Sequence, residues 1–172
     1  MSKTITVETT INASLDEVWS EVSRIENHSN WMKDAVNIDF ESEIKSGVGT
    51  KIKVLTKIGP LKLYDYMTFT KWEEKKIIGV DHIGIVTGKG EMEFNKIDNN
   101  TTKFKWTETL KFPFFNTCDV LSNWTLFSIK SLSLSMFASL EHAIKNIIKK
   151  IKGLMFFIFQ SHSLNYLNFL SI

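Results

Sequence analysis

The chain has 172 residues, of which 43% are hydrophobic and 23% are charged. This composition is ordinary for a globular protein and excludes a disordered or fibrous chain. The length fits one domain of roughly 100–200 residues, and a net charge of +2 is too small for a dedicated nucleic-acid binder. The single cysteine, Cys118, cannot form an internal disulfide, and no basic-then-apolar leader opens the chain. We therefore expect a reduced, cytoplasmic protein.

The first part of the chain predicts one strand and two short helices. Lys3–Ile11 alternates apolar and polar residues, as a half-buried strand does. Ser14 and Glu17 follow at the spacing of a capping box, in which each side chain accepts the backbone N–H of the other residue. Apolar residues at helical spacing come next, and a second short helical segment is expected over Ile25–Met32.

From Val36 to Lys111 the chain alternates between strand patterns and turn signals. Neighbouring strands with such short connections must run antiparallel. The expected strands are Val36–Ile44, Thr50–Ile58, Leu61–Trp72, Ile77–Val86, Glu91–Ile97 and Thr102–Lys111. Gly47-Val48-Gly49 and Gly88-Lys89-Gly90 are interpreted as turns between these strands, because neither has the residues that continue a phosphate-binding loop.

The last of these strands shows most clearly which residues share a side. Lysines occupy one side, and Phe104, Trp106 and Glu108 occupy the other. Since lysines face water, Glu108 is expected on the apolar side, where a carboxylate is costly unless it has a partner. In two earlier strands both sides carry apolar residues. The pattern therefore leaves open which side is taken by Asp65, Tyr66, Asp81 and His82.

Beyond Pro113 the sequence predicts helix. Phe137–Ile151 carries an apolar stripe at helical spacing, and Gly153 fits a helix C-cap. Val120–Met136 is also expected to be helical, although its last residues alternate with serine as in a strand. A long terminal helix must bury its stripe against the sheet. The order of elements is therefore an α+β layout.

Three segments resemble START-like (SRPBCC) proteins of the polyketide cyclase/dehydrase and lipid-transport group, namely Ile11–Trp19, Ile25–Met32 and Gly47–Thr50. The rhythm of strands and turns is also similar to that group, so that the resemblance covers Lys3–Pro113. It implies a helix-grip fold, in which a curved antiparallel sheet wraps around a long C-terminal helix and encloses a hydrophobic cavity. Members bind lipids, polyketides, sterols, quinones or hormones, and some catalyse cyclisation or dehydration.

The candidate catalytic residues are ionisable groups expected at such a cavity, namely Glu108, His82 and Asp65. Burial raises the pKa of a carboxyl group, and histidine exchanges protons near neutral pH. The alternative for Glu108 is a carboxylate bonded to a neighbouring strand or to Tyr66. For His82 and His28 the alternative is a structural hydrogen bond. The candidate ligand-binding residues, which can equally be core, are Trp31, His28, Val54, Tyr66, Met67, Phe69, Met92, Phe94, Phe104 and Trp106.

Residues 153–172 are predicted to form an apolar tail after a single domain of residues 1–152. The tail carries no charged residue, and its longest apolar run is far shorter than the roughly 20 residues that span a bilayer. Four lysines just before it favour an anionic membrane surface. The alternatives are packing onto the domain, a dimer contact or no role.

Three functions are compatible with these patterns. The favoured one is binding or transport of a hydrophobic small molecule, such as a lipid, polyketide or quinone-like compound, because no acid/base pair stands at a defined spacing. The second is a polyketide cyclase/dehydratase-type enzyme that uses acid/base residues in the same cavity. The third is a membrane- or partner-interaction protein that acts through the tail. The four histidines have no metal-ligand spacing, so neither a metal nor a cofactor is expected.

Overall fold

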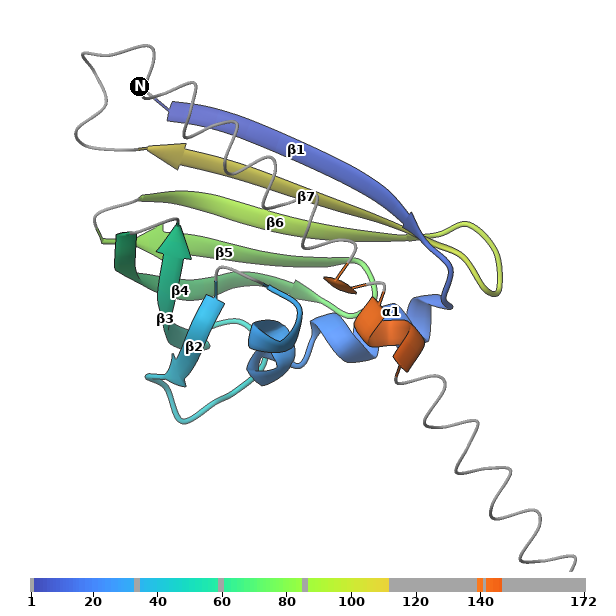
Figure 1. The fold of residues 1–172 in the computed structure, drawn as a ribbon, viewed down its shortest axis with the longest axis horizontal. Coiled ribbons are helices and arrows are strands. Elements are labelled where there is room, and N and C mark those ends of the chain that lie inside the picture. The colour runs from blue at the N-terminus through green and yellow to red at the C-terminus, as the bar shows by residue number, and fades with distance from the viewer. Residues whose placement is uncertain are drawn as a thin grey trace, which may run out of the picture.

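The computed structural model describes residues 2–32, 35–58, 61–84, 87–111, 139–140 and 142–146. Seven strands form one antiparallel sheet in the order β1-β7-β6-β5-β4-β3-β2 (Figure 1). The elements are β1 (Ser2–Ile11), α1 (Leu15–Val22), the 3₁₀ helix η1 (Ile25–Asn30), β2 (Ala35–Phe40), β3 (Lys51–Ile58), β4 (Leu61–Glu73), β5 (Ile77–Ile83), β6 (Thr87–Lys96) and β7 (Thr102–Lys111). The predicted order of one strand, two short helices and six antiparallel strands is confirmed.

Short turns explain the order of the sheet. Each strand from β2 to β6 pairs with the next one along the chain, because a short connection leaves room only for an antiparallel neighbour. The strand β1 then pairs along its whole length with β7, with Ser2 opposite Lys111 and Ile11 opposite Thr102. The first and last strands of the described sheet are therefore neighbours.

The helix α1 begins at the predicted capping box. The Ser14 N–H donates to Glu17 Oε2 at 2.9 Å, and the Glu17 N–H donates to Ser14 Oγ at 3.3 Å. Val18 and Val22 are fully buried, and the Trp19 ring meets the Phe94 ring edge-on at a centroid distance of 5.2 Å. The helix therefore packs its apolar face onto β6.

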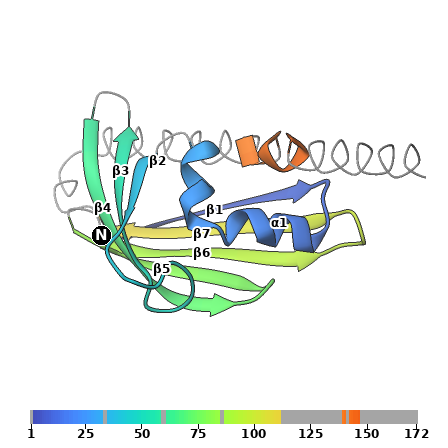
Figure 2. The ribbon, with the colours of Figure 1, turned by 90° about the horizontal axis from the view of Figure 1, so that it is seen from below.

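The sheet curves, and one side of it is concave. Figure 2 shows β2, β3 and the start of β4 standing up from the layer formed by β1, β7 and β6, with α1, η1 and the helix of residues 142–146 on the concave side. The core lies between this face and the helices. Leu140 and Ile144 are buried in it, which confirms the predicted stripe for the described part of the terminal helix.

The prediction of a turn at Gly88-Lys89-Gly90 is wrong, because these residues lie inside β6. A Cβ atom on Gly88 would collide with the Thr109 carbonyl oxygen of β7, and a Cβ atom on Gly90 would lie 2.7 Å from Glu108 Oε1. Glycine inside a strand marks a place where another part of the chain approaches closely. Glycine is therefore required at both positions, because β7 lies too close for a side chain.

Two strands are shorter than predicted. The strand expected over Val36–Ile44 ends at Phe40, and the strand expected over Ile77–Val86 ends at Ile83. Val120–Met136, Cys118 and the tail of residues 153–172 lie outside the described residues, so their roles stay predictions, as does the cytoplasmic location. Within the described ranges, no helix is long and apolar enough to cross a membrane.

Replacing Ser14 with alanine removes the hydroxyl that accepts the Glu17 N–H. Loss of an N-cap side chain costs about 1 kcal/mol, so we expect the free energy of unfolding in a urea titration to fall by about that amount. Ser29→Ala, at an exposed position in η1, is the control and should change stability little. Equal effects of the two substitutions would contradict the role of the capping box.

Candidate functional site

Asp65 and His82 face the concave side of the sheet. Asp65 lies opposite Val54 of β3, and Met67 lies opposite both Ile52 of β3 and His82 of β5. Residues directly opposite each other in a sheet share a face, and Val54 and Ile52 are buried. Asp65, Met67 and His82 therefore point into the interior, where His82 Nδ1 lies 2.8 Å from Asp65 Oδ2.

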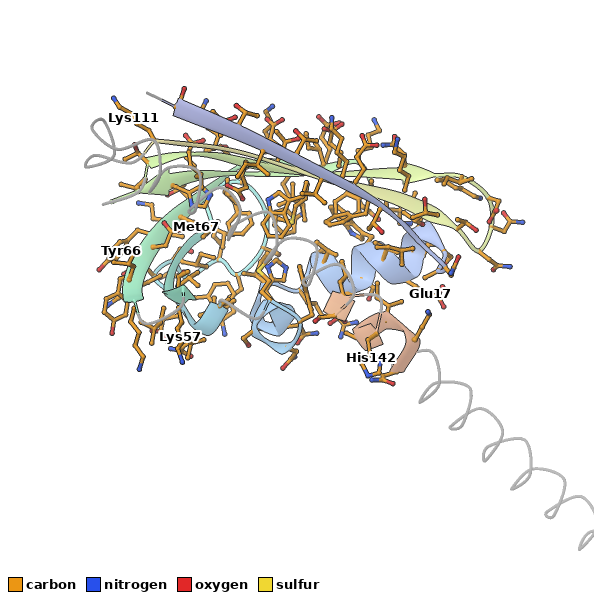
Figure 3. The ribbon with its side chains drawn as sticks, turned by 45° about the horizontal axis from the view of Figure 1, so that its top comes forward. Glu17, Lys57, Tyr66, Met67, Lys111 and His142 are labelled. Carbon is orange, nitrogen blue, oxygen red and sulfur yellow. The ribbon has the colours of Figure 1, made fainter. Side chains whose placement is uncertain are left out.

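Tyr66 faces the opposite side of the sheet. It pairs with Lys53 and with Ile83, whose exposed fraction is 55%. The Lys53 ammonium group lies 5.8 Å from the centre of the Tyr66 ring. Figure 3 shows Tyr66 and Met67 on opposite sides of β4. The structure therefore does not bring Tyr66 to Asp65 and His82, and it places Asp81 on the outer face with Tyr66.

Glu108 reaches His82 across the intervening strand β6. Gly90 of β6 lies opposite Glu108, and its missing side chain leaves the space that the Glu108 carboxylate occupies. The indole N–H of Trp106 donates to Glu108 Oε1 at 2.7 Å, and Glu108 Oε2 lies 3.2 Å from His82 Nε2. The Glu108 side chain is 13% exposed, which confirms that it faces the apolar side. Its partners are Trp106 and His82 rather than Tyr66.

We call Asp65, His82 and Glu108 the acid–histidine cluster. The His82 side chain is 6% exposed. Burial lowers its pKa, but the hydrogen bond to Asp65 and the negative charges of Asp65 and Glu108 outweigh burial and raise the pKa to about 10. The ring is therefore an imidazolium at neutral pH, and its Nδ1–H donates to Asp65.

One donor and one acceptor in the cluster are left without an aligned partner. His82 Nε2 and Glu108 Oε2 are both buried and have no hydrogen-bond partner among the described residues. Their separation of 3.2 Å is that of an ion pair, but the two groups are not directed at each other as a hydrogen bond requires. The concave face therefore holds a buried donor and a buried acceptor side by side.

The cluster is not arranged as a metal site. Asp65 and Glu108 lie at opposite nitrogens of the His82 ring, so the three side chains do not converge on one point. In the described part of the chain, no group of three or more His, Cys, Asp or Glu residues is arranged to hold a metal ion.

His28 has a structural contact away from the cluster. Its side chain is buried, its Nε2 lies 2.6 Å from the Val22 carbonyl oxygen, and its ring packs against Trp31 at a centroid distance of 4.8 Å. Burial lowers the pKa of His28 to about 4, so the ring is neutral and Nε2–H donates to the carbonyl. His28 therefore joins η1 to the end of α1.

The apolar candidates belong to the core on the concave side. Trp31 is buried, and its indole N–H has no partner among the residues described. The other buried candidates are Val54, Phe69, Met92, Phe94 and Phe104, and the half-buried ones that pack against them are Met67 and Trp106. A contact between any of these side chains and a ligand stays a prediction.

Glu21 is a buried acid that the sequence patterns did not single out. It is 3% exposed, burial raises its pKa, and its Oε2 has no hydrogen-bond partner in the described ranges. Helical spacing could have indicated that Glu21 is buried, since it stands three residues after Val18 and four before Ile25. It shares the buried face of α1 with Val18, and Ile25 is the buried first residue of η1.

The two buried histidines should differ in charge. In a ¹⁵N NMR titration, both ring nitrogens of His82 should carry protons at about pH 8, because two carboxylates hold the charge. His28 should stay neutral down to about pH 5, because burial lowers its pKa more than the Val22 carbonyl and the charge of Glu26 raise it. Titration of His82 near its ordinary value of about 6.5 would contradict the geometry of the cluster.

His82 should also make stability depend on pH. Its pKa is higher in the folded chain than in the unfolded chain, so its contribution is fully present below about pH 6.5 and is lost as pH rises to about 10. The difference in unfolding free energy between the wild type and His82→Gln should therefore shrink over this interval. The exposed His142 supplies the control variant, His142→Gln, which should show no such convergence with the wild type.

No family model matches the chain, and no curated protein matches it. Solved structures do match. The Zhui aromatase/cyclase from Streptomyces sp. R1128 is 12% identical over 86% of this chain and 96% of that chain, with a TM-score of 0.75. A START superfamily protein from Mycobacterium smegmatis is 9% identical over 84% and 98%, with a TM-score of 0.72. Norcoclaurine synthase from Thalictrum flavum is 17% identical over 85% and 88%, with a TM-score of 0.64. The chain therefore has the helix-grip fold of the START-like (SRPBCC) proteins, the family that its sequence resembles.

Proposed function

We propose that the protein binds a hydrophobic small molecule between the concave face of the sheet and the terminal helix. The observation that carries this proposal is the buried donor and acceptor at His82 Nε2 and Glu108 Oε2, which form an ion pair but have no hydrogen-bond partner among the described side chains. A buried polar atom without a hydrogen bond costs about 1–3 kcal/mol. A ligand that supplies the missing hydrogen bonds recovers this cost.

The surroundings of the cluster suit an apolar ligand. The concave face carries aromatic and aliphatic side chains, among them Phe69, Met92 and Phe104. Ligand sites are mostly apolar with a few polar groups that set orientation. Burial of ligand surface contributes about 25 cal/mol for each Å², and the acid–histidine cluster orients the molecule. The Thalictrum flavum synthase of the same fold was solved in complex with dopamine and hydroxybenzaldehyde, which supports a small-molecule site in such a fold.

The second candidate function is acid/base catalysis by the same cluster. The hydrogen bond from His82 to Asp65 and the nearby Glu108 carboxylate form the arrangement that favours it. Glu108 Oε2 is the atom that would accept a proton, because the neighbouring His82 ring already carries one. A solved structure of this fold is an aromatase/cyclase, which supports catalysis as an alternative.

Native mass spectrometry of the purified full chain tests binding. We expect a fraction of the protein to carry a co-purified molecule that is released on denaturation. Met67→Trp adds bulk on the concave face and should reduce that fraction severalfold. Tyr66→Trp adds bulk on the opposite face of β4 and should leave it unchanged. A ligand-free wild type, or equal loss from both variants, would refute the proposal.

Catalysis is tested with the molecule that co-purifies. If the cluster is an active site, excess wild-type protein should change the mass or absorption spectrum of that molecule. Glu108→Gln keeps the shape of the side chain but removes the base, so turnover should fall by at least about 100-fold. Glu91→Gln, on the outer face of β6, is the control. A molecule that both proteins leave unaltered favours binding without chemistry.

A further inference from the structure

We propose that the anchoring group of the ligand is a neutral hydroxyl, which accepts a hydrogen bond from His82 Nε2 and donates one to Glu108 Oε2. This inference rests on the proposed binding function and names the chemical class of the ligand. It predicts a hydrophobic alcohol or phenol rather than a fatty acid, an amine or a hydrocarbon.

The geometry holds both atoms in place while leaving their hydrogen-bonding capacity unused. The hydrogen bond of 2.8 Å between His82 Nδ1 and Asp65 sets the orientation of the ring. The hydrogen bond of 2.7 Å from Trp106 to Oε1 sets the orientation of the Glu108 carboxylate. His82 Nε2 and Glu108 Oε2 then form an ion pair at 3.2 Å without the alignment of a hydrogen bond. Rotation of either side chain into line with the other would break its existing hydrogen bond, which is to Asp65 for His82 and to Trp106 for Glu108.

The pairing of one donor with one acceptor selects the ligand group. A hydroxyl both donates and accepts, so it can satisfy His82 Nε2 and Glu108 Oε2 together. An ether or ketone only accepts and leaves Glu108 Oε2 unpaired. An ammonium group only donates and meets the N–H of His82. A carboxylate meets the two carboxylates of the cluster, which outnumber the single imidazolium.

The strand β6 keeps the acceptor in position. Gly90 lies beneath the Glu108 carboxylate, and a Cβ atom there would lie 2.7 Å from Oε1 and 3.1 Å from Val80 Cγ2. Gly90→Ala therefore pushes the carboxylate away from its position without changing any charge. This gives a second way to disturb the hydroxyl site, in which Asp65, His82 and Glu108 themselves are not substituted.

Four matched probes test the inference on the full chain by isothermal titration calorimetry. They are 2-naphthol, 2-methoxynaphthalene, 2-naphthoate and 2-(aminomethyl)naphthalene, which share a ring system and differ in the polar group. We expect 2-naphthol to bind about 10- to 100-fold more tightly than 2-methoxynaphthalene, as hydrogen bonds to charged groups imply. The anionic and cationic probes should bind more weakly than 2-naphthol.

Two variants should remove this preference. In Glu108→Gln and in Gly90→Ala, the affinity for 2-naphthol should fall to within about threefold of that for 2-methoxynaphthalene, because the charged acceptor is lost or displaced. The affinity for 2-methoxynaphthalene should stay within about twofold of its wild-type value, because its apolar contacts remain. Glu91→Gln changes the same residue type on the outer face and should alter neither affinity. Circular dichroism establishes that each variant is folded.

The outcomes separate the two proposals. Equal binding of 2-naphthol and 2-methoxynaphthalene by the wild type would overturn the hydroxyl inference and leave the binding function standing. Tightest binding of the cationic or anionic probe would also overturn it, in favour of that group. If none of the four probes binds, the binding function fails and the inference fails with it.

Discussion

The buried imidazole of His82 lies between two carboxylates, and this arrangement decides the charge of the candidate site. Burial alone makes a histidine neutral, as the core shows at His28, where a backbone carbonyl is the partner and the pKa is about 4. At His82 the partners are Asp65 and Glu108, and the pKa rises to about 10. Two histidines with similar burial therefore carry different charges because their partners differ. The positive ring in turn makes two half-buried carboxylates tolerable on an apolar face.

The cluster requires three features of the sheet at once. The pairing of β4 with β5 brings Asp65 beside His82. Gly90 leaves β6 without a side chain where the Glu108 carboxylate passes over it, so that β7 can reach β5. The curvature of the sheet turns this face toward α1, η1 and the terminal helix (Figure 2). Apolar side chains surround the polar atoms there, which is the setting in which hydrogen bonds select a ligand group most strongly.

Fold and function are separate questions for this chain. The helix-grip fold is shared with solved structures that include an aromatase/cyclase and a plant synthase, at identities of 12% and 17%. One fold can host different chemistries, so the function has to be argued from the site. The site of this chain offers His82 Nε2 and Glu108 Oε2, which have no hydrogen-bond partner in the described part of the structure.

The order of strands and helices up to Lys111 could be predicted from the sequence, because residue alternation, the Ser14–Glu17 capping box and turn residues act over a few positions. The sequence also placed Glu108 on the buried face, since the lysines of β7 occupy the other face. The faces of Asp65, Tyr66 and His82 could not be predicted locally, because β4 and β5 carry apolar residues on both sides and the register with the neighbouring strands settles the choice. The same holds for Gly88 and Gly90, which resemble turn residues locally but lie within β6. Glycine is required at these two positions because β7, about twenty residues away along the chain, lies close to them. A local sequence pattern does not reveal that contact.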